Sequence, residues 1–256
     1  MYLRFKLKTP KDFGIKIISV GNLTVGGSGK TPLVTALAKE EKNPAVILRG
    51  YGRASHGLVI VKDKNKILCD VKTSGDEAMI YAKKLPYATV IVSEDRKTAI
   101  NKAKELGCEI IFLDDAYSKH DIKKEDIIID VTSKNSFCLP SGPYRERLWH
   151  GKDVKILRED IDFTREVSVM DITKKMALVT AIARPQRLDK YLPENVISKH
   201  YFPDHHSFTK DELSMILQSD GVDSLLVTFK DYVKIEDFGL PLSLLDLEIK
   251  VKKTTL

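Results

Sequence analysis

The chain has 256 residues, of which 43% are hydrophobic and 30% are charged, a composition that excludes a disordered chain and fits a folded protein with a sizeable core. Its 42 lysine and arginine residues outnumber its 36 acidic residues, which suits phosphate ligands or an anionic membrane surface, and we expect no nucleic-acid partner. No apolar run approaches the roughly 18–20 residues that cross a bilayer, and Cys69, Cys108 and Cys138 lack the paired spacing of disulfides or zinc sites. The N-terminus lacks the apolar centre of a signal peptide, so we predict a cytoplasmic protein, with contact to a membrane face.

Short apolar segments alternate with helical patterns in the first half of the chain. We predict strands over 16–23, 44–50, 88–93, 109–115 and 126–132, and helices over 31–41, 75–85 and 95–106. This order favours right-handed crossovers, so the predicted fold class is α/β, with a doubly wound, mostly parallel sheet. Such sheets bind ligands beyond the carboxyl ends of their strands, and most polar motifs of this chain follow strands.

Residues 135–153 are rich in turn formers and interrupt this alternation, so we interpret them as a linker and hinge. Beyond them we predict a strand, a loop and a helix over 175–192, strands over 196–202 and 223–229, and a helix over 209–219. The sequence therefore predicts a nucleotide-binding core over 1–148 and a smaller C-terminal α/β domain over 149–256 that closes over the site.

A glycine-rich loop, GNLTVGGSGKT at 21–31, joins the first predicted strand to the first predicted helix. Its glycines let backbone N–H groups close around an anion, and the helix N-terminus adds positive potential. Lys30 can reach the β- and γ-phosphates of a nucleotide and the Thr31 hydroxyl can take a Mg²⁺ position, although Thr24 replaces the first glycine of the P-loop motif. We predict a P-loop NTPase-like core with nucleotide contacts from Thr24, Val25, Gly26, Gly27, Ser28, Gly29, Lys30 and Thr31.

The predicted nucleotide is ATP, because no Asn-Lys-x-Asp motif for reading guanine follows a predicted strand. Asp114 and Asp115 end a strand, where carboxylates beside a P-loop can hold Mg²⁺, and we favour this role over a turn cap. Asp76 and Glu77 allow two interpretations equally, a capping box from Ser74 to Glu77 or a base at Asp76 that accepts an alcohol proton.

Two arginine-containing turns, RGYGR at 49–53 and PYRER at 143–147, can bind an anionic substrate or stand as solvated surface. Asp204-His205-His206 precedes a helix with a capping box from Thr209 to Glu212. Adjacent histidines diverge and make a poor metal pair, whereas one histidine oriented by a carboxylate can handle protons.

Several motifs together resemble one family, the tetraacyldisaccharide 4'-kinases of lipid A synthesis. The glycine-rich loop with two glycines before Ser-Gly-Lys-Thr and the downstream Phe-Pro-Asp-His-His are the most specific of them. The motifs are VGNLTVGGSGKTP (20–32), RGYGR (49–53), SGDEAMIYA (74–82), FLDDAYSKH (112–120), LPSGPYRE (139–146), ARPQR (183–187), FPDHHSFT (202–209) and LLVTFKDYVKI (225–235).

The resemblance implies transfer of the γ-phosphate of ATP to the 4'-hydroxyl of a tetraacylated disaccharide 1-phosphate, at the cytoplasmic face of the bacterial inner membrane. It implies a peripheral protein with a lipid disaccharide substrate, and we infer no obligate protein partner. It makes Asp76 the base, assisted by His205, and Lys30 a catalytic residue. It also implies a metal environment of Thr31, Glu77, Asp114, Asp115 and Glu146, and a substrate site lined by Tyr51, Arg53 and Arg145.

The chain departs from the family pattern in three places: Asp-Asp-Ala-Tyr-Ser-Lys-His at 114–120, Ala183 before Arg-Pro, and Phe229 in place of a carboxylate. About 14 residues precede the first predicted strand, too few for a long amphipathic anchor. Because basic and apolar residues interleave there, we predict weak membrane attachment through residues 2–11.

Two other functions remain open from the sequence. One is a P-loop GTPase or metallochaperone-type NTPase that acts on a partner protein, and the other is a regulatory nucleotide-binding module without chemistry. A GTPase would hydrolyse its nucleotide without any lipid and would bind guanine selectively. Intact Lys30, Thr31, Asp76 and His205 argue against the module.

Overall fold

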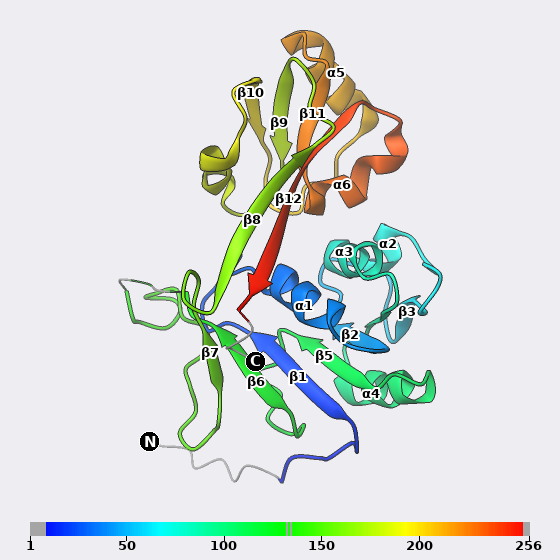
Figure 1. The fold of residues 1–256 in the computed structure, drawn as a ribbon, viewed down its shortest axis with the longest axis vertical. Helices are drawn as coiled ribbons and strands as arrows, with labels where there is room; N and C mark the ends of the chain where they lie inside the picture. Colours follow the sequence, from blue (N-terminus) through cyan, green and yellow to red (C-terminus); the bar gives the residue numbers. More distant parts are fainter. Residues whose placement is uncertain (1–8, 132, 134, 253–256) are drawn as a thin grey trace.

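The structure of the chain is a computed structural model that describes residues 9–131, 133 and 135–252. Two α/β units follow one another along its long axis and are joined by two long strands (Figure 1). Most of the N-terminal segment for which we predict membrane attachment, residues 2–8, lies outside the described part of the chain.

The first unit is built on a seven-stranded sheet with the order β3-β4-β2-β5-β1-β6-β7. Neighbouring strands are parallel apart from the antiparallel edge strand β3, which confirms the predicted doubly wound, mostly parallel sheet. Val20 of β1 pairs with Asp114 of β5, so the glycine-rich loop and Asp114 leave the sheet at the same edge. The strands are β1 (Lys16–Gly21), β2 (Pro44–Leu48), β3 (Val59–Lys62), β4 (Thr89–Val92), β5 (Ile110–Asp114), β6 (Glu125–Ile129) and β7 (Lys155–Leu157).

Helices cover both faces of this sheet. On one face Leu33 and Leu37 of α1 and Met79 of α3 are buried in a single apolar cluster, and on the other Ala99 and Ile100 of α4 are buried in a second. The spacing of Leu33 and Leu37 places both on one helix face, and each fully buried leucine contributes about 1.5–3 kcal/mol. The helices are α1 (Lys30–Lys39), α2 (Val71–Ser74), α3 (Asp76–Lys84) and α4 (Arg96–Glu105).

The segment 135–153, predicted to be a linker and hinge, packs against the first unit. The Val25 N–H donates to the Pro143 carbonyl (2.8 Å), and the Arg145 N–H donates to the Leu23 carbonyl (2.9 Å). The segment thus braces the glycine-rich loop, and its role as a hinge stays a prediction. After it β7 pairs with β6, so the first sheet extends past the domain boundary that we predict after residue 148.

The second unit carries a five-stranded sheet with the order β10-β9-β11-β12-β8, parallel except for β12 and β8, as expected for a smaller α/β domain. Leu213 of α5 and Val227 of β11 are buried on one face, and Leu188 and Leu226 on the other. The helix predicted within 175–192 is a 3-10 turn that begins at Pro185, where a proline has no N–H to lose. The elements are β8 (Phe163–Met170), β9 (Met176–Thr180), η1 (Pro185–Tyr191), β10 (Val196–Tyr201), α5 (Lys210–Asp220), β11 (Ser224–Thr228), α6 (Phe229–Ile235), η2 (Glu236–Phe238) and β12 (Leu242–Val251).

The long antiparallel pair β8 and β12 joins the two units, and neither strand is among the predicted elements. The pair runs from the second sheet down to α1 of the first unit (Figure 1). Phe163 and Ile249 are buried in the same apolar cluster as Leu33. The second unit is therefore packed on the first by a shared apolar core, and the edge of the first sheet that carries the P-loop faces it.

Candidate active site

The glycine-rich loop makes two turns that favour glycine before α1 begins. Gly26 and Gly29 have φ angles of 101° and 88°, in the left-handed region that a residue without a Cβ enters at little cost. Gly29 is the N-cap of α1, and no side chain caps this helix. The first N–H groups of α1, which have no partner within the helix, are therefore available to an anion at the mouth of the loop.

The two halves of the loop differ in what they can bind. Residues 26–31 line a cavity of about 1110 Å³ between the two units. Thr24 and Val25 are not among its lining residues, since Thr24 is buried and its carbonyl accepts a hydrogen bond from Asn22 Nδ2 (2.6 Å), and the Val25 N–H is bonded to Pro143. Of the predicted phosphate contacts, residues 26–31 are therefore the ones that line the cavity.

Lys30 is held at the mouth of the loop by polar partners. Its Nζ donates to Asn22 Oδ1 (2.8 Å) and lies 3.9 Å from Asp115 Oδ1. Arg145 clamps the same carboxylate with both guanidinium nitrogens and also donates to Asn22 Oδ1 (3.1 Å). Burial raises the pKa of Asp115, but the Arg145 hydrogen bond and the charge of Lys30 outweigh burial and leave the pKa lowered.

Asp114 is a buried carboxyl group directly behind the P-loop. Its Oδ2 accepts a hydrogen bond from the Tyr81 hydroxyl (2.9 Å), whereas its Oδ1 is buried without a hydrogen-bond partner in the described part of the chain. Burial, followed by the charge of Glu77, raises the pKa of Asp114 to about 7, while Lys30 acts in the opposite direction. A cation beside this carboxyl would satisfy the orphaned oxygen and favour its ionised form.

Asp76 and His205 come from different units and meet beside this cavity, which His205 lines and Asp76 does not. His205 Nδ1 lies 3.2 Å from Asp76 Oδ2, and His205 and Glu77, the neighbour of Asp76, both line the cavity. The helix α3 begins at Asp76 after Gly75, with no side-chain cap. The capping-box interpretation of Ser74 and Glu77 is therefore wrong, and the Asp76 carboxylate faces the second unit instead.

Lysines and a second carboxylate complete the surroundings of this pair. Lys234 Nζ lies 3.3 Å from Asp76 Oδ2, and Lys230 donates to Asp204 Oδ1 (2.9 Å). His205 Nε2 lies 3.5 Å from Lys230 Nζ and 3.8 Å from Asp204 Oδ2. The φ angle of His205 is 64°, a conformation that costs a non-glycine residue energy and that its contacts maintain.

The three predicted substrate residues lie in different surroundings, and none of them lines the main cavity. Tyr51 is 73% exposed, and its ring centroid is 5.6 Å from that of His205, beside the proton-handling pair. Arg145 is occupied by Asp115. Arg53 donates to the Gly57 carbonyl (2.6 Å) on its own loop and pairs with Glu94 (2.5 Å) after β4, so its guanidinium ties the two segments together.

The predicted metal-binding residues also lie in different surroundings. Thr31 and Glu77 line the cavity and Asp114 lies behind it, whereas Asp115 is held by Arg145. Burial raises the pKa of Glu146, with the charge of Arg145 acting against the shift. No group of three His, Cys, Asp or Glu residues in the described ranges is placed to hold a metal by itself. A metal-binding role for these residues stays a prediction.

The altered loop after Asp115 is used for packing. The His120 ring lies 4.5 Å from the Trp149 ring, and Lys152 Nζ lies 3.2 Å from His120 Nδ1. Phe229, the other notable departure, packs under Lys84, whose Nζ is 4.5 Å from the ring centroid. His120 does not line the main cavity. Its contacts with Trp149 and Lys152 instead hold the segment 148–152 in place.

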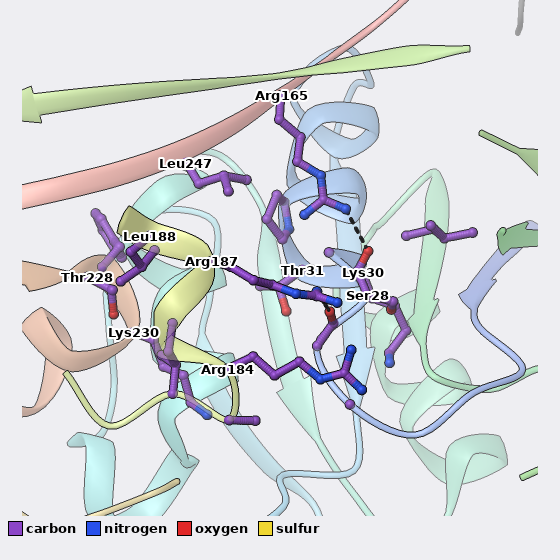
Figure 2. Close-up of a pocket in the computed structure, with 18 of the residues that line it drawn as sticks. Ser28, Lys30, Thr31, Arg165, Arg184, Arg187, Leu188, Thr228, Lys230 and Leu247 are labelled. Atoms are coloured by element: carbon purple, nitrogen blue, oxygen red, sulfur yellow. Dashed lines mark hydrogen bonds between the residues drawn. The ribbon is translucent and has the colours of Figure 1, made fainter. Parts of the chain in front are cut away.

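Several residues of the site are missed by the sequence reasoning. Arg165, Arg184 and Arg187 line the cavity opposite the P-loop (Figure 2), and Lys234 contacts Asp76. The motif ARPQR at 183–187 is the only local signal for two of them. No helix in the described residues is both long and apolar enough to span a bilayer.

Comparisons with known proteins agree on one family. The model of the tetraacyldisaccharide-1-P 4'-kinase family matches residues 1–255. The tetraacyldisaccharide 4'-kinase of Aliarcobacter butzleri is 49% identical over 259 residues, which cover 97% of this chain and 82% of that protein. That of Helicobacter pylori (strain J99) is 46% identical over 251 residues, which cover 96% and 80%.

A solved structure has the same fold. The "apo" form of LpxK from Aquifex aeolicus in complex with ATP superposes with a TM-score of 0.74 and 25% sequence identity, and the match covers 96% of this chain and 87% of that one. These matches give no support to the GTPase or metallochaperone alternative.

Proposed function

We propose that Asp76, His205 and Lys30 carry out the chemistry of this chain. The chain belongs to the tetraacyldisaccharide-1-P 4'-kinase family. It transfers the γ-phosphate of ATP to the 4'-hydroxyl of its lipid disaccharide. The observation that carries the residue assignment is the 3.2 Å contact of Asp76 with His205. It joins the two units beside the cavity that the P-loop also lines.

Asp76 is the proton acceptor in this proposal. As the 4'-oxygen attacks the γ-phosphorus, the bond from that phosphorus to ADP breaks, and the hydroxyl proton passes to the Asp76 carboxylate. Lys234, 3.3 Å away, forms an ion pair with the carboxylate before the transfer. His205 donates to Asp76 from Nδ1 when that nitrogen carries its proton, and so orients the base.

Lys30 neutralises charge on the transferred phosphate. Its ammonium group, now bonded to Asn22 Oδ1 at 2.8 Å, exchanges this neutral acceptor for phosphate oxygens when ATP binds. Phosphoryl transfer needs positioning and charge stabilisation more than covalent chemistry. The exchange is favourable because a bond between two charged groups is stronger than one to an amide.

The site also fits Mg²⁺, with Thr31, Glu77 and Asp114 as the residues that would hold it directly or through water. The supporting observation is the buried Asp114 oxygen without a hydrogen-bond partner in the described ranges. When bound, Mg²⁺ supplies positive charge at the β- and γ-phosphate oxygens. Asp115 serves this site indirectly, by positioning Lys30.

We further propose a peripheral position on the cytoplasmic face of the inner membrane. Large apolar side chains are exposed on the segment 137–156, among them Phe137 (66%) and Leu139 (54%), together with Trp149. Lys155 is exposed on the same segment, and tryptophan beside basic residues suits an anionic bilayer surface. Co-sedimentation with anionic vesicles tests this surface in a double variant that carries Phe137→Ser and Trp149→Ser. If the double variant sediments as fully as the wild type, this surface does not carry the attachment.

The reaction itself is tested by incubating the protein with γ-labelled ATP and a tetraacyldisaccharide 1-phosphate. We expect label in a bisphosphorylated lipid, one ADP for each lipid converted, and little hydrolysis without lipid because closure excludes water. GTP in place of ATP should give much less product. Nucleotide hydrolysis at an equal rate with and without lipid would contradict the assignment.

A further inference from the structure

Arginine side chains of the second unit converge on the carbonyl side of the P-loop (Figure 2). Arg165 of β8 donates from Nη2 to the Ser28 carbonyl (3.1 Å), and Arg187 of η1 donates from Nη1 to the Gly27 carbonyl (3.2 Å). Both contacts cross from one unit to the other. A guanidinium that touches these glycine-rich residues is within reach of whatever anion their amides bind.

Arg184 completes the group. Its Nη2 is 3.5 Å from the point where a Cβ on Gly26 would stand, so its guanidinium lies against the loop. With Lys30, four cationic side chains of the cavity wall surround one loop. Among the described residues the one carboxylate within ion-pair distance of the three arginines is Glu159, 3.0 Å from Arg165 Nε.

This surplus of positive charge is costly without an anion. Burial, followed by the charges of Arg184 and Arg165, lowers the pKa of Arg187, and Glu159 only partly opposes the shift. The Gly27 carbonyl is a neutral acceptor, whereas a phosphate takes two parallel hydrogen bonds and a full opposite charge from one guanidinium. The three arginines are thus placed for a ligand with several negative charges.

The arginines are not equivalent. Arg165 is 18% exposed and paired with Glu159, so it fixes β8 to the loop. Arg184 and Arg187 are exposed in the cavity and have no carboxylate partner in the described part of the chain. We propose that Arg184 and Arg187 bind the terminal phosphates of ATP from the second unit, opposite Lys30.

The proposal rests on the use of ATP proposed above, and it distinguishes ATP from the lipid. The lipid also carries a phosphate, but its 1-phosphate lies on the other sugar from the reacting 4'-hydroxyl. With that hydroxyl at the γ-phosphate, the 1-phosphate is a disaccharide away from the P-loop that Arg187 touches. The nearby anion during the reaction is therefore the triphosphate.

The test is the affinity of the full chain for ATP, ADP and AMP, measured by titration calorimetry without lipid. In Arg184→Gln and in Arg187→Gln we expect ATP affinity to fall by about 10-fold or more, with a smaller fall for ADP and none for AMP. Lys210→Gln is the matched control, since it removes one exposed positive charge from α5 of the same unit and does not line the cavity, and it should bind all three nucleotides as the wild type does.

Arg187→Lys keeps the positive charge but loses the two parallel hydrogen bonds of a guanidinium. We therefore expect its affinity for ATP to lie between the affinity of the wild type and that of Arg187→Gln. The unfolding temperature without nucleotide should not fall in either glutamine variant, because the replaced side chains are exposed and the substitution relieves repulsion among the arginines. ATP affinity within about two-fold of the wild type in both glutamine variants, with Lys30→Ala impaired, overturns the role of the arginines and leaves the proposed function intact. A wild type that does not bind ATP overturns the proposed function itself.

Discussion

The two ends of the cavity handle charge in opposite ways. At the phosphate end Lys30, Arg184 and Arg187 stand over the P-loop, and the carboxylate paired with the arginine group there is Glu159 on Arg165. At the acceptor end Asp76 is paired with Lys234, and Asp204 with Lys230. A surplus of positive charge attracts a polyanion, whereas a balanced group keeps one carboxylate available for a proton without attracting a second anion.

The two ends also differ in how they are built. The phosphate end is formed largely by backbone, since the loop is braced by residues 143–145 and continues into α1. The acceptor end exists only where α3 of the first unit meets the loop after β10 of the second, at Asp76 and His205. A single substitution at the acceptor end should therefore remove chemistry, while one at the phosphate end should remove both binding and chemistry.

The largest effect on this contrast between the two ends is expected from Asp76→Asn. We expect kcat to fall by about 10²–10⁴-fold with the affinity for ATP unchanged, because the amide cannot accept the hydroxyl proton. His205→Ala should also lower kcat with ATP affinity unchanged, and His200→Ala is its matched control, since His200 forms a pair with Asp220 (2.6 Å) and does not line the cavity. Weakened ATP binding in Asp76→Asn would show that the two ends are not separable.

Lys30→Ala should reduce both kcat and the affinity for ATP. We expect kcat to fall by about 10²–10³-fold through lost charge stabilisation, together with a weaker affinity for ATP in calorimetry. Lys39→Ala, on the same helix and paired with Glu248 at the surface, is the control and should match the wild type. Unchanged ATP affinity in Lys30→Ala would place the phosphates away from this loop.

Asp114 adds a pH dependence at the phosphate end. Its pKa is raised from 3.8 to about 7, so the folded protein holds a proton there that the unfolded chain has lost. The stability from this group is present below pH 3.8 and is lost as the pH rises through about 7. Without ligands, we expect the free energy of unfolding to fall over this window by up to about 1.4 kcal/mol per pH unit.

Chemical denaturation at several pH values measures this slope, and Asp114→Asn should flatten it because the amide does not titrate. The outcome that contradicts the prediction is the same slope in the variant and the wild type. Mg²⁺ with a non-hydrolysable ATP analogue should restore more stability above pH 7 in the wild type than in Asp114→Asn.

The smallest expected effect is at the rim of the acceptor end. Tyr51→Ala removes an exposed ring that neighbours His205, so we expect a rise of a few-fold in KM for the lipid and little change in kcat. Steady-state kinetics with varied lipid separates the two. A fall in kcat as large as that of Asp76→Asn would move Tyr51 into the chemistry.

The sequence by itself determined the five inner strands of the first sheet and the phosphate loop, because both appear as local sequence patterns, whereas the edge strands β3 and β7 are absent from the predicted elements. Apolar segments of strand length alternate with helical patterns, and the glycines and Lys30 follow directly on the strand that presents them. It also contained the alternation of LDLEIKV at 245–251, typical of a half-buried strand, although β8 and β12 are absent from the predicted elements. Their length and pairing partner are not local properties.

Only the tertiary structure decided which side chains share the cavity. Arg165 and Ser28 are 137 residues apart and Arg187 and Gly27 are 160 apart, so their contacts depend on how the two units pack. Within the first unit, Arg53 pairs with Glu94 and the Val25 N–H donates to the Pro143 carbonyl, and neither Arg53 nor Val25 lines the cavity. Long side chains take the partner that folding brings within hydrogen-bond reach, and no local pattern specifies that partner.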